Sequence, residues 1–104
     1  MKLAMLFFFA ASTWQNGVDL AFTRAAGQCG QCHANGYTIS VRLEMDKGAD
    51  VLDQHEKFDA KDEKKARDWA KKFPGACGIT VTMRPKVKDG WAGMGTYSEC
   101  KEAN

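Results

Sequence analysis

Apolar and polar residues alternate most regularly over residues 37–45, where apolar side chains hold the odd positions and polar ones the even positions. A period of two indicates a strand with one buried face. Shorter alternations at residues 18–23 and 79–83 predict two more strands, and residues 51–58 are interpreted as another. Strand patterns therefore recur between residues 18 and 83, separated by turns and one helix.

The N-terminal run consists of Lys2 followed by the nine apolar residues 3–11. Asn16 and Gly17 follow it, and Asn-Gly is the dipeptide that best fits a tight hairpin turn. We therefore expect a hairpin over residues 2–25, with its first strand buried. The alternative is a signal peptide over residues 1–12, with a charged start, a short apolar stretch and small residues before the cleavage point. Nine apolar residues are too few to span a bilayer, so no membrane span is expected.

A helix is predicted from residue 59 to about residue 72. Asp59 is a plausible N-cap, and Ala66, Trp69, Ala70 and Phe73 form one apolar stripe at helical spacing. Pro74 then ends the helix, because the residue before a proline avoids helical geometry. From Arg84 onward the chain is rich in glycine and reads as turns.

These elements predict an α+β fold: a mainly antiparallel sheet of about five strands with one helix packed on a face. The 104 residues are enough for a single domain, taken as residues 1–104, and 44% hydrophobic residues exclude intrinsic disorder. A formal net charge of +2 excludes a strongly acidic DNA mimic. No motif joins a nucleophile to a base, and His55 is interpreted as a surface residue, so the chain is not expected to be an enzyme.

The segment Cys29-Gly30-Gln31-Cys32-His33 carries the most chemistry. It resembles the haem attachment motif of c-type cytochromes. The resemblance covers five residues and implies thioether bonds at Cys29 and Cys32, iron ligation by His33, and Met83 or Met94 as the distal ligand. The predicted strands depart from the helical surroundings of haem in the small cytochromes c.

The cysteines also allow a zinc site or disulfides. Cys29, Cys32, Cys77 and Cys100 can complete one tetrahedral zinc site, although only the first two have the short spacing of a strong zinc motif. Disulfides that join one of the first pair to Cys77 and the other to Cys100 would tie the loop and the tail to the core. A Cys29–Cys32 redox pair is not expected, because a strand rather than a helix follows it. Four reduced, buried cysteines are the remaining alternative, and no bound cofactor is the leading expectation.

Candidate partner-binding residues lie in the tail and on the predicted helix. Trp91, Met94 and Tyr97 stand among glycines, where aromatic side chains can anchor a partner or where Trp91 can fold back as a lid. Lys64 and Lys71 belong to a basic helix that can contact a protein or, with weaker support, nucleic acid. Acidic residues interrupt this run, so a solvated helix face explains it equally well.

Together these features predict a small non-enzymatic interaction module that binds another macromolecule, with a protein as the expected partner. We expect it to act as an inhibitor or accessory factor, of the kind that phages encode against host defences. Its expected location is the cytoplasm. The first alternative is a secreted, disulfide-stapled effector or toxin, if residues 1–12 are a signal peptide. The second is a c-type haem electron carrier that uses Cys29, Cys32 and His33.

Overall fold

The computed structural model describes residues 2–100, with side chains from residue 13 onward. Four antiparallel strands form one sheet in the order β2-β1-β3-β4. The strands are β1 (Tyr37–Met45), β2 (Gln54–Asp59), β3 (Ala76–Pro85) and β4 (Gly93–Ser98). The helices are α1 (Lys2–Gln28), α2 (Cys32–Asn35) and α3 (Glu63–Lys71), with a 3-10 turn, η1 (Ala60–Asp62), before α3.

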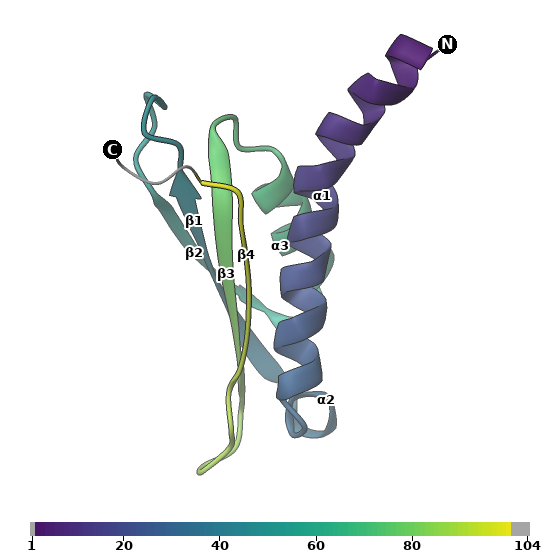
Figure 1. The fold of residues 1–104 in the computed structure, drawn as a ribbon. Helices are drawn as coiled ribbons and strands as arrows, with labels where there is room; N and C mark the ends of the chain where they lie inside the picture. The colour runs from purple at the N-terminus through teal and green to yellow at the C-terminus, as the bar shows by residue number, and fades with distance from the viewer. Residues whose placement is uncertain (1, 101–104) are drawn as a thin grey trace.

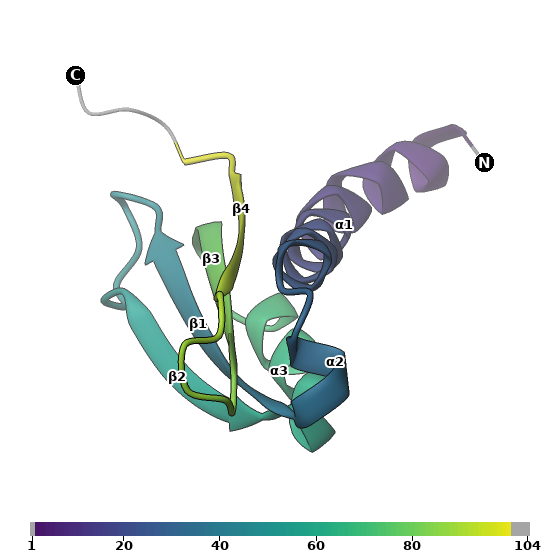
Figure 2. The ribbon, with the colours of Figure 1, turned by 90° about the horizontal axis from the view of Figure 1, so that it is seen from below.

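All of these helices lie on one face of the sheet, which gives the molecule two layers (Figure 1, Figure 2). The predicted α+β class is therefore confirmed, with four strands rather than five and with α1 as a second long helix. No helix within the described residues combines the length and the apolar character needed to cross a membrane.

The hairpin predicted over residues 2–25 is wrong, because this segment is the first 24 residues of the 27-residue helix α1. The alternation of Val18, Leu20 and Phe22 suggested a strand, yet Leu20 is 40% exposed whereas Val18 and Phe22 are fully buried. The buried residues Val18, Ala21, Phe22 and Ala25 follow the spacing of a helix face. Residues 1–12 lie outside the described side chains, but the backbone from Lys2 onward is helical and not the expected strand.

The prediction for residues 37–45 is confirmed residue for residue, and the other predicted strands are partly right. β2 begins three residues later than expected, and β3 extends beyond residues 79–83 at both ends. The predicted helix is divided between η1 and α3, and Asp59 makes no side-chain capping bond. β4 was missed, because its glycine-rich sequence looks like turns.

The core lies between the sheet and the helices. Its largest fully buried side chains come from α1, β1 and β3, which shows that the long N-terminal helix supplies one wall of the core. The buried cluster also includes Ala66 and Ala70 of α3, as the predicted stripe requires, with Trp69 and Phe73 packed against it. The largest members are Phe22, Ile39, Leu43, Met83, Val18, Val41 and Val81.

Glycines let α1 lie directly against β4. A methyl group on Gly93 would overlap the backbone oxygen of Ala25, and one on Gly95 would overlap the backbone oxygen of Ala21. Across the same interface, the ring of Tyr97 occupies the space that a side chain at Gly17 would need. The two backbones therefore approach as closely as they do only because residues without side chains occupy these positions.

Ion pairs join α1 to α3. Asp19 of α1 accepts hydrogen bonds of 3.0 Å from both Arg67 and Lys71 of α3. Partial burial alone would raise the pKa of Asp19, but these two cations outweigh it and hold the pKa below its ordinary value. Arg67 also pairs with Glu63 at 3.1 Å, and the carboxylate of Glu63 accepts a hydrogen bond from the Tyr37 hydroxyl. This network fixes α3 to both α1 and β1.

Replacing Gly95 with valine tests the contact between α1 and β4. We expect Gly95→Val to lower the free energy of unfolding by about 3 kcal/mol, because the added side chain must displace the helix backbone. Met94→Val is the matched control, since it places the same side chain on the other face of the same strand and is expected to change stability by less than about 0.5 kcal/mol. Urea unfolding of the oxidised proteins measures both. Equal stability of the two variants would contradict the close packing.

Candidate functional site

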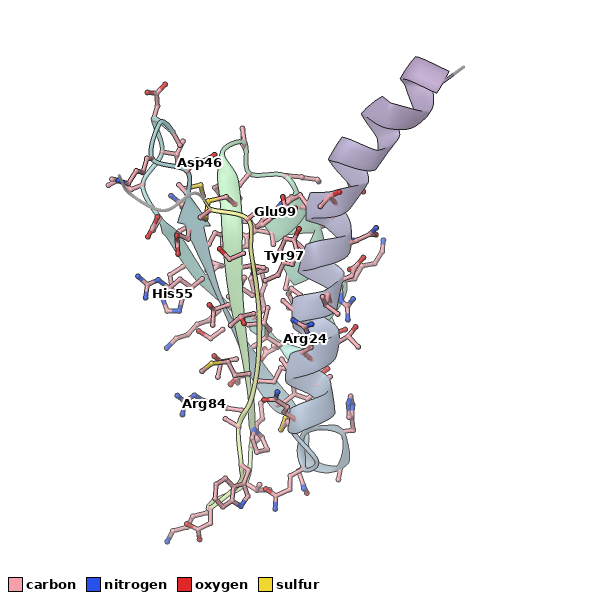
Figure 3. The ribbon with its side chains drawn as sticks, viewed as in Figure 1. Arg24, Asp46, His55, Arg84, Tyr97 and Glu99 are labelled. Atoms are coloured by element: carbon pink, nitrogen blue, oxygen red, sulfur yellow. A yellow bond between two sulfur atoms is a disulfide. The ribbon has the colours of Figure 1, made fainter. Side chains whose placement is uncertain are left out.

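The face of the sheet opposite the helices, called the open face below, is polar. Because side chains alternate along each strand, the residues that flank the buried positions of β1 all point to this side. Figure 3 shows His55 and Arg84 projecting from the side of the sheet away from α1. The open face consists of Thr38, Ser40, Arg42 and Glu44 of β1, His55, Lys57 and Asp59 of β2, Thr80, Thr82 and Arg84 of β3, and Met94, Thr96 and Ser98 of β4.

Strand register sets the neighbours across this face. Ser40 lies opposite Lys57 on one side and Thr82 on the other, and Thr82 in turn lies opposite Met94. One step along, Arg42 lies opposite His55 and Thr80. Hydroxyl groups thus occupy the middle of the face, with positively charged side chains around them.

The charges of the open face are unbalanced. Arg42, Lys57 and Arg84 are exposed, and none of them belongs to an ion pair among residues 13–100. Of the two acidic residues of the face, Asp59 is 3.6 Å from the amine of Lys86, whereas Glu44 is exposed and in no ion pair among residues 13–100. Three unpaired cations against one unpaired carboxylate leave the face with an excess of positive charge within the described part of the protein.

Two shallow hollows run along the open face and share Ser40, His55 and Thr82. The larger has a volume of about 640 Å³ and reaches Arg84, Lys57 and Asp59. The second has a volume of about 490 Å³ and extends past Arg42 toward Asp53. Both are open to solvent along the sheet, which suits an extended contact better than an enclosed small molecule.

Ser40 and His55 meet at the centre of these hollows, with 2.8 Å between the serine hydroxyl oxygen and Nε2 of the histidine. The expectation that His55 is a surface residue is confirmed. An activated serine also needs a group that orients the histidine and donors for the developing oxyanion. No described carboxylate bonds to His55, so among the described residues the pair is a hydroxyl and an imidazole without an orienting group.

The positively charged part of this site was not predicted. The alternation over residues 37–45 already assigns Ser40 and Arg42 to the polar face of one strand. It does not tell which strands lie beside that strand. Lys57 and Arg84 reach the same surface only because β2 and β3 pair with β1. Strand order was the missing information.

The four cysteines form two disulfides, Cys29–Cys32 and Cys77–Cys100. Of the alternatives left open, the connectivity that joins Cys29 and Cys32 to Cys77 and Cys100 is therefore not the one formed. A Cys29–Cys32 pair, which was not expected, is present, and the short helix α2 rather than a strand follows it. The reason is position: the first pair lies between α1 and α2 at one end of the sheet, and the second lies where β3 begins and β4 ends, at the other end (Figure 1). A cysteine in a disulfide has no thiolate to offer zinc, so this form of the protein does not assemble the four-cysteine site.

The geometry around Cys29 and Cys32 also bears on the haem motif. Both residues are fully buried with their sulfur atoms joined, whereas thioether bonds would need each sulfur free. Met83 is fully buried in the core, and Met94 is on the open face, across the sheet from α2 and His33 (Figure 2). His33 is exposed, and its ring packs edge-on against Tyr37. The resemblance is thus confined to the five-residue string.

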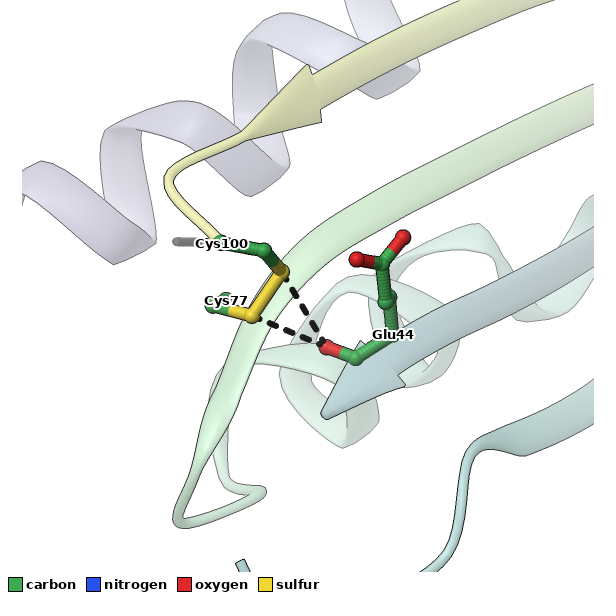
Figure 4. A group of neighbouring side chains, drawn as sticks. All are labelled: Glu44, Cys77 and Cys100. Atoms are coloured by element: carbon green, nitrogen blue, oxygen red, sulfur yellow. Dashed lines mark hydrogen bonds between the residues drawn. A yellow bond between two sulfur atoms is a disulfide. The ribbon is translucent and has the colours of Figure 1, made fainter. Parts of the chain in front are cut away.

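The second disulfide lies beside β1. The carbonyl oxygen of Glu44 is 3.5 Å from the sulfur of Cys77 and 3.9 Å from that of Cys100 (Figure 4). The carboxylate of Glu44 and the two sulfur atoms lie within 4.8 Å of one another, which makes this the one group of potential metal ligands found among the described residues. In the oxidised protein the Cys77–Cys100 disulfide links the segment after β4 to the start of β3.

The candidate partner-binding residues fall into two groups. Trp91 is 81% exposed and Met94 is 52% exposed, so the possibility that Trp91 folds back as a lid is not what the structure adopts. Lys64 is also exposed, on α3. Lys71 instead binds Asp19, which leaves its amine already paired.

Tyr97 is not a free anchor. Its ring lies against Gly17 and its centroid is 6.2 Å from that of Trp14, on the helix side of the sheet. Burial, together with the carboxylate of Glu99, raises the pKa of Tyr97 to about 12. The hydroxyl therefore stays protonated at neutral pH, and the ring is part of the contact between α1 and β4.

Selective reduction tests the burial of the two disulfides. Cys29 and Cys32 are fully buried, whereas Cys77 is 6% exposed and Cys100 is more accessible. Because thiol exchange needs access to sulfur, we expect a mild thiol followed by iodoacetamide to label Cys77 and Cys100 first, as read by peptide mass. In denaturant the two pairs should label together. Earlier labelling of Cys29 and Cys32 in the native protein would contradict this arrangement.

Truncation of Trp91 tests whether its side chain contributes to the stability of the fold or is free to contact a partner. Because the side chain is 81% exposed, Trp91→Ala is expected to change the free energy of unfolding by less than about 0.5 kcal/mol. The melting temperature of the oxidised protein measures this effect. A large fall would show that Trp91 covers part of the fold and is not available to a partner.

Comparison with known proteins gives the chain no relatives: no family model, no curated protein and no solved structure matches it. The interpretation of the site therefore depends on its own geometry.

Proposed function

We propose that this protein is a non-catalytic binding module whose open face contacts an acidic surface of a partner protein. The observation that carries the proposal is the set of three cations, Arg42, Lys57 and Arg84, that take part in no ion pair among residues 13–100. Charged groups left unpaired on one surface attract partners of opposite charge and guide their orientation.

The geometry of the open face supports a specific contact. Its three cations come from three neighbouring strands, so hydrogen bonds between β1, β2 and β3 fix their spacing. The hydroxyl groups of Ser40 and Thr82 lie between them, and hydroxyls both donate and accept hydrogen bonds. Groups held on strands are positioned more precisely than groups on loops.

A protein partner is favoured over nucleic acid. Proteins that hold single strands commonly stack bases on aromatic side chains. The open face has no aromatic ring other than that of His55, and Met94 supplies its one long apolar side chain, at 52% exposed.

The disulfides support the secreted form of this proposal over the cytoplasmic one. Disulfides persist in oxidising compartments and are rare in the cytosol. The Cys77–Cys100 pair closes a long loop, and such a constraint stabilises by about 3 kcal/mol. A partner would then be met outside the reducing cytosol. We therefore propose that the protein acts as a secreted effector or inhibitor that blocks the activity of this partner.

Reversing the charge of the open face tests the proposal. We expect Arg42→Glu/Arg84→Glu to weaken binding of fluorescent poly-L-glutamate about tenfold or more, because each lost charge contact contributes roughly 1 kcal/mol. Fluorescence anisotropy at low salt measures the dissociation constant. The matched control, Lys61→Glu/Lys64→Glu, makes the same change in net charge at exposed positions on the helix side of the molecule.

Three results would overturn the proposal. An equal loss in the Lys61→Glu/Lys64→Glu control would show that net charge or the basic helix governs binding. Tighter binding of single-stranded DNA than of poly-L-glutamate would favour nucleic acid. No binding to poly-L-glutamate by the unmodified protein would remove the acidic partner.

A further inference from the structure

The two edges of the sheet differ in whether their backbone groups are satisfied. At the β4 edge, Arg24 of α1 donates a 3.1 Å hydrogen bond to the carbonyl oxygen of Thr96. The backbone N–H of Met94 donates to Oε1 of Gln28, also of α1, at 3.3 Å. The backbone N–H of Trp91 likewise donates to Oε1 of Gln31 at 3.2 Å. Side chains from α1 and the turn after it therefore close this edge.

The β2 edge has no such cover within the described residues. β2 pairs with β1 alone, and the outward backbone groups of Gln54–Asp59 have no partner there. The strand is exposed at three successive positions, His55, Glu56 and Lys57. In an antiparallel ladder, alternate residues of an edge strand direct both N–H and C=O outward, where another strand can pair with them.

We propose that the β2 edge binds an extended segment of the acidic partner, which joins the sheet as a fifth strand. This inference rests on the proposed function and specifies how the partner is held. Backbone hydrogen bonds to β2 supply the attachment, and the side chains of the added strand supply the choice of partner.

The charges of β2 determine which side chains that segment carries. His55, Lys57 and Asp59 lie on the open face, and Lys57 is the positively charged residue among them, beside Ser40 of β1. Asp59 is 3.6 Å from the amine of Lys86. Every second side chain of an added strand points to the same face, directly opposite the side chains of β2. Opposite charges in such pairs stabilise the sheet, whereas like charges destabilise it. A glutamate or aspartate opposite Lys57, with an uncharged residue opposite Asp59, therefore fits this edge.

An apolar residue is expected at one end of the segment. Val51 and Leu52 immediately precede β2, and they are 40% and 85% exposed. An apolar side chain of the partner that contacts them would bury surface that is now in contact with water. The segment is thus expected to carry an acidic residue opposite Lys57 and an apolar residue beside Leu52.

A second copy of this chain is a poorer occupant. If two β2 strands pair antiparallel with the helices of both copies on the same side, the central pair is two identical residues. Around the middle of the strand these are His55, Glu56 or Lys57. With Glu56 or Lys57 at the centre, two like charges lie directly opposite each other, which destabilises the pairing. Two of the three central registers thus oppose self-pairing, whereas an acidic residue opposite Lys57 is allowed in each copy.

The test uses the full oxidised protein and a labelled ten-residue peptide of alternating glutamate and valine. The matched control peptide has the same sequence with alternate backbone nitrogens methylated, which removes hydrogen-bond donors and keeps every charge. We expect the control peptide to bind at least tenfold more weakly by fluorescence anisotropy. Hydrogen exchange of the complex should slow at amides of residues 54–59 and stay unchanged in β4.

Substitutions locate the contact. Lys57→Glu is expected to weaken binding of the peptide at least tenfold. Lys61→Glu, the same change on η1, should weaken binding by less than twofold. Leu52→Ser should weaken binding about threefold or more. All three positions are exposed, so thermal unfolding of these variants should match that of the unmodified protein.

The outcomes separate this inference from the proposed function. If both peptides bind equally and depend on Arg42 and Arg84, with unchanged exchange in β2, the edge pairing is wrong and the charged face still binds. If neither peptide nor poly-L-glutamate binds, the proposed function fails as well. Slowed exchange of β2 in a dimer of the free protein would identify a second copy as the occupant and overturn the inference.

Discussion

The close approach of α1 to β4 is the constraint on which the rest of the structure depends. A helix and a strand normally keep their backbones apart by the width of their side chains. Here Gly93 and Gly95 face Ala21 and Ala25, and the backbone oxygens of the helix occupy the space that side chains at these glycines would fill. This contact positions Val18 and Phe22 over the sheet, where they form one wall of the core. Without it, α1 would lie farther from the sheet and would be held mainly by the ion pairs of Asp19 with α3.

The same contact makes the molecule asymmetric. All helices cover one face, so the other face stays open and polar (Figure 2). Because α1 packs alongside β4, the side chains of Arg24 and Gln28 in α1 reach the outward backbone groups of β4 and close this edge. The opposite edge, β2, is left without cover in the described part of the chain. The proposed edge contact therefore lies at the edge of the sheet opposite β4, and the proposed binding surface lies on the face opposite α1.

The disulfides reinforce the two ends of this arrangement. Cys29–Cys32 fixes the turn by which the chain leaves α1, and Cys77–Cys100 ties the segment after β4 back to the start of β3. A small domain buries a limited amount of apolar surface, so such links supply stability that the core alone does not. The Cys29–Cys32 pair is buried, and the Cys77–Cys100 pair lies at the end of the sheet, where Cys100 reaches the open face only beside Glu44 and Ser98. Neither disulfide lines the hollows around Ser40 and His55.

The sequence by itself determined the α+β class, the strand over residues 37–45 and the apolar stripe of α3, because each follows from a local period of side chains. It misassigned α1, since Val18, Leu20 and Phe22 fit a strand as well as a helix, and only burial of Ala21 and Ala25 against glycine distinguishes the two. It missed β4, whose glycines are explained by the helix they contact. It also left the cysteine pairing open. The joint surface of Arg42, Lys57 and Arg84 was decided by tertiary structure, because strand order is set by long-range pairing that no local pattern encodes.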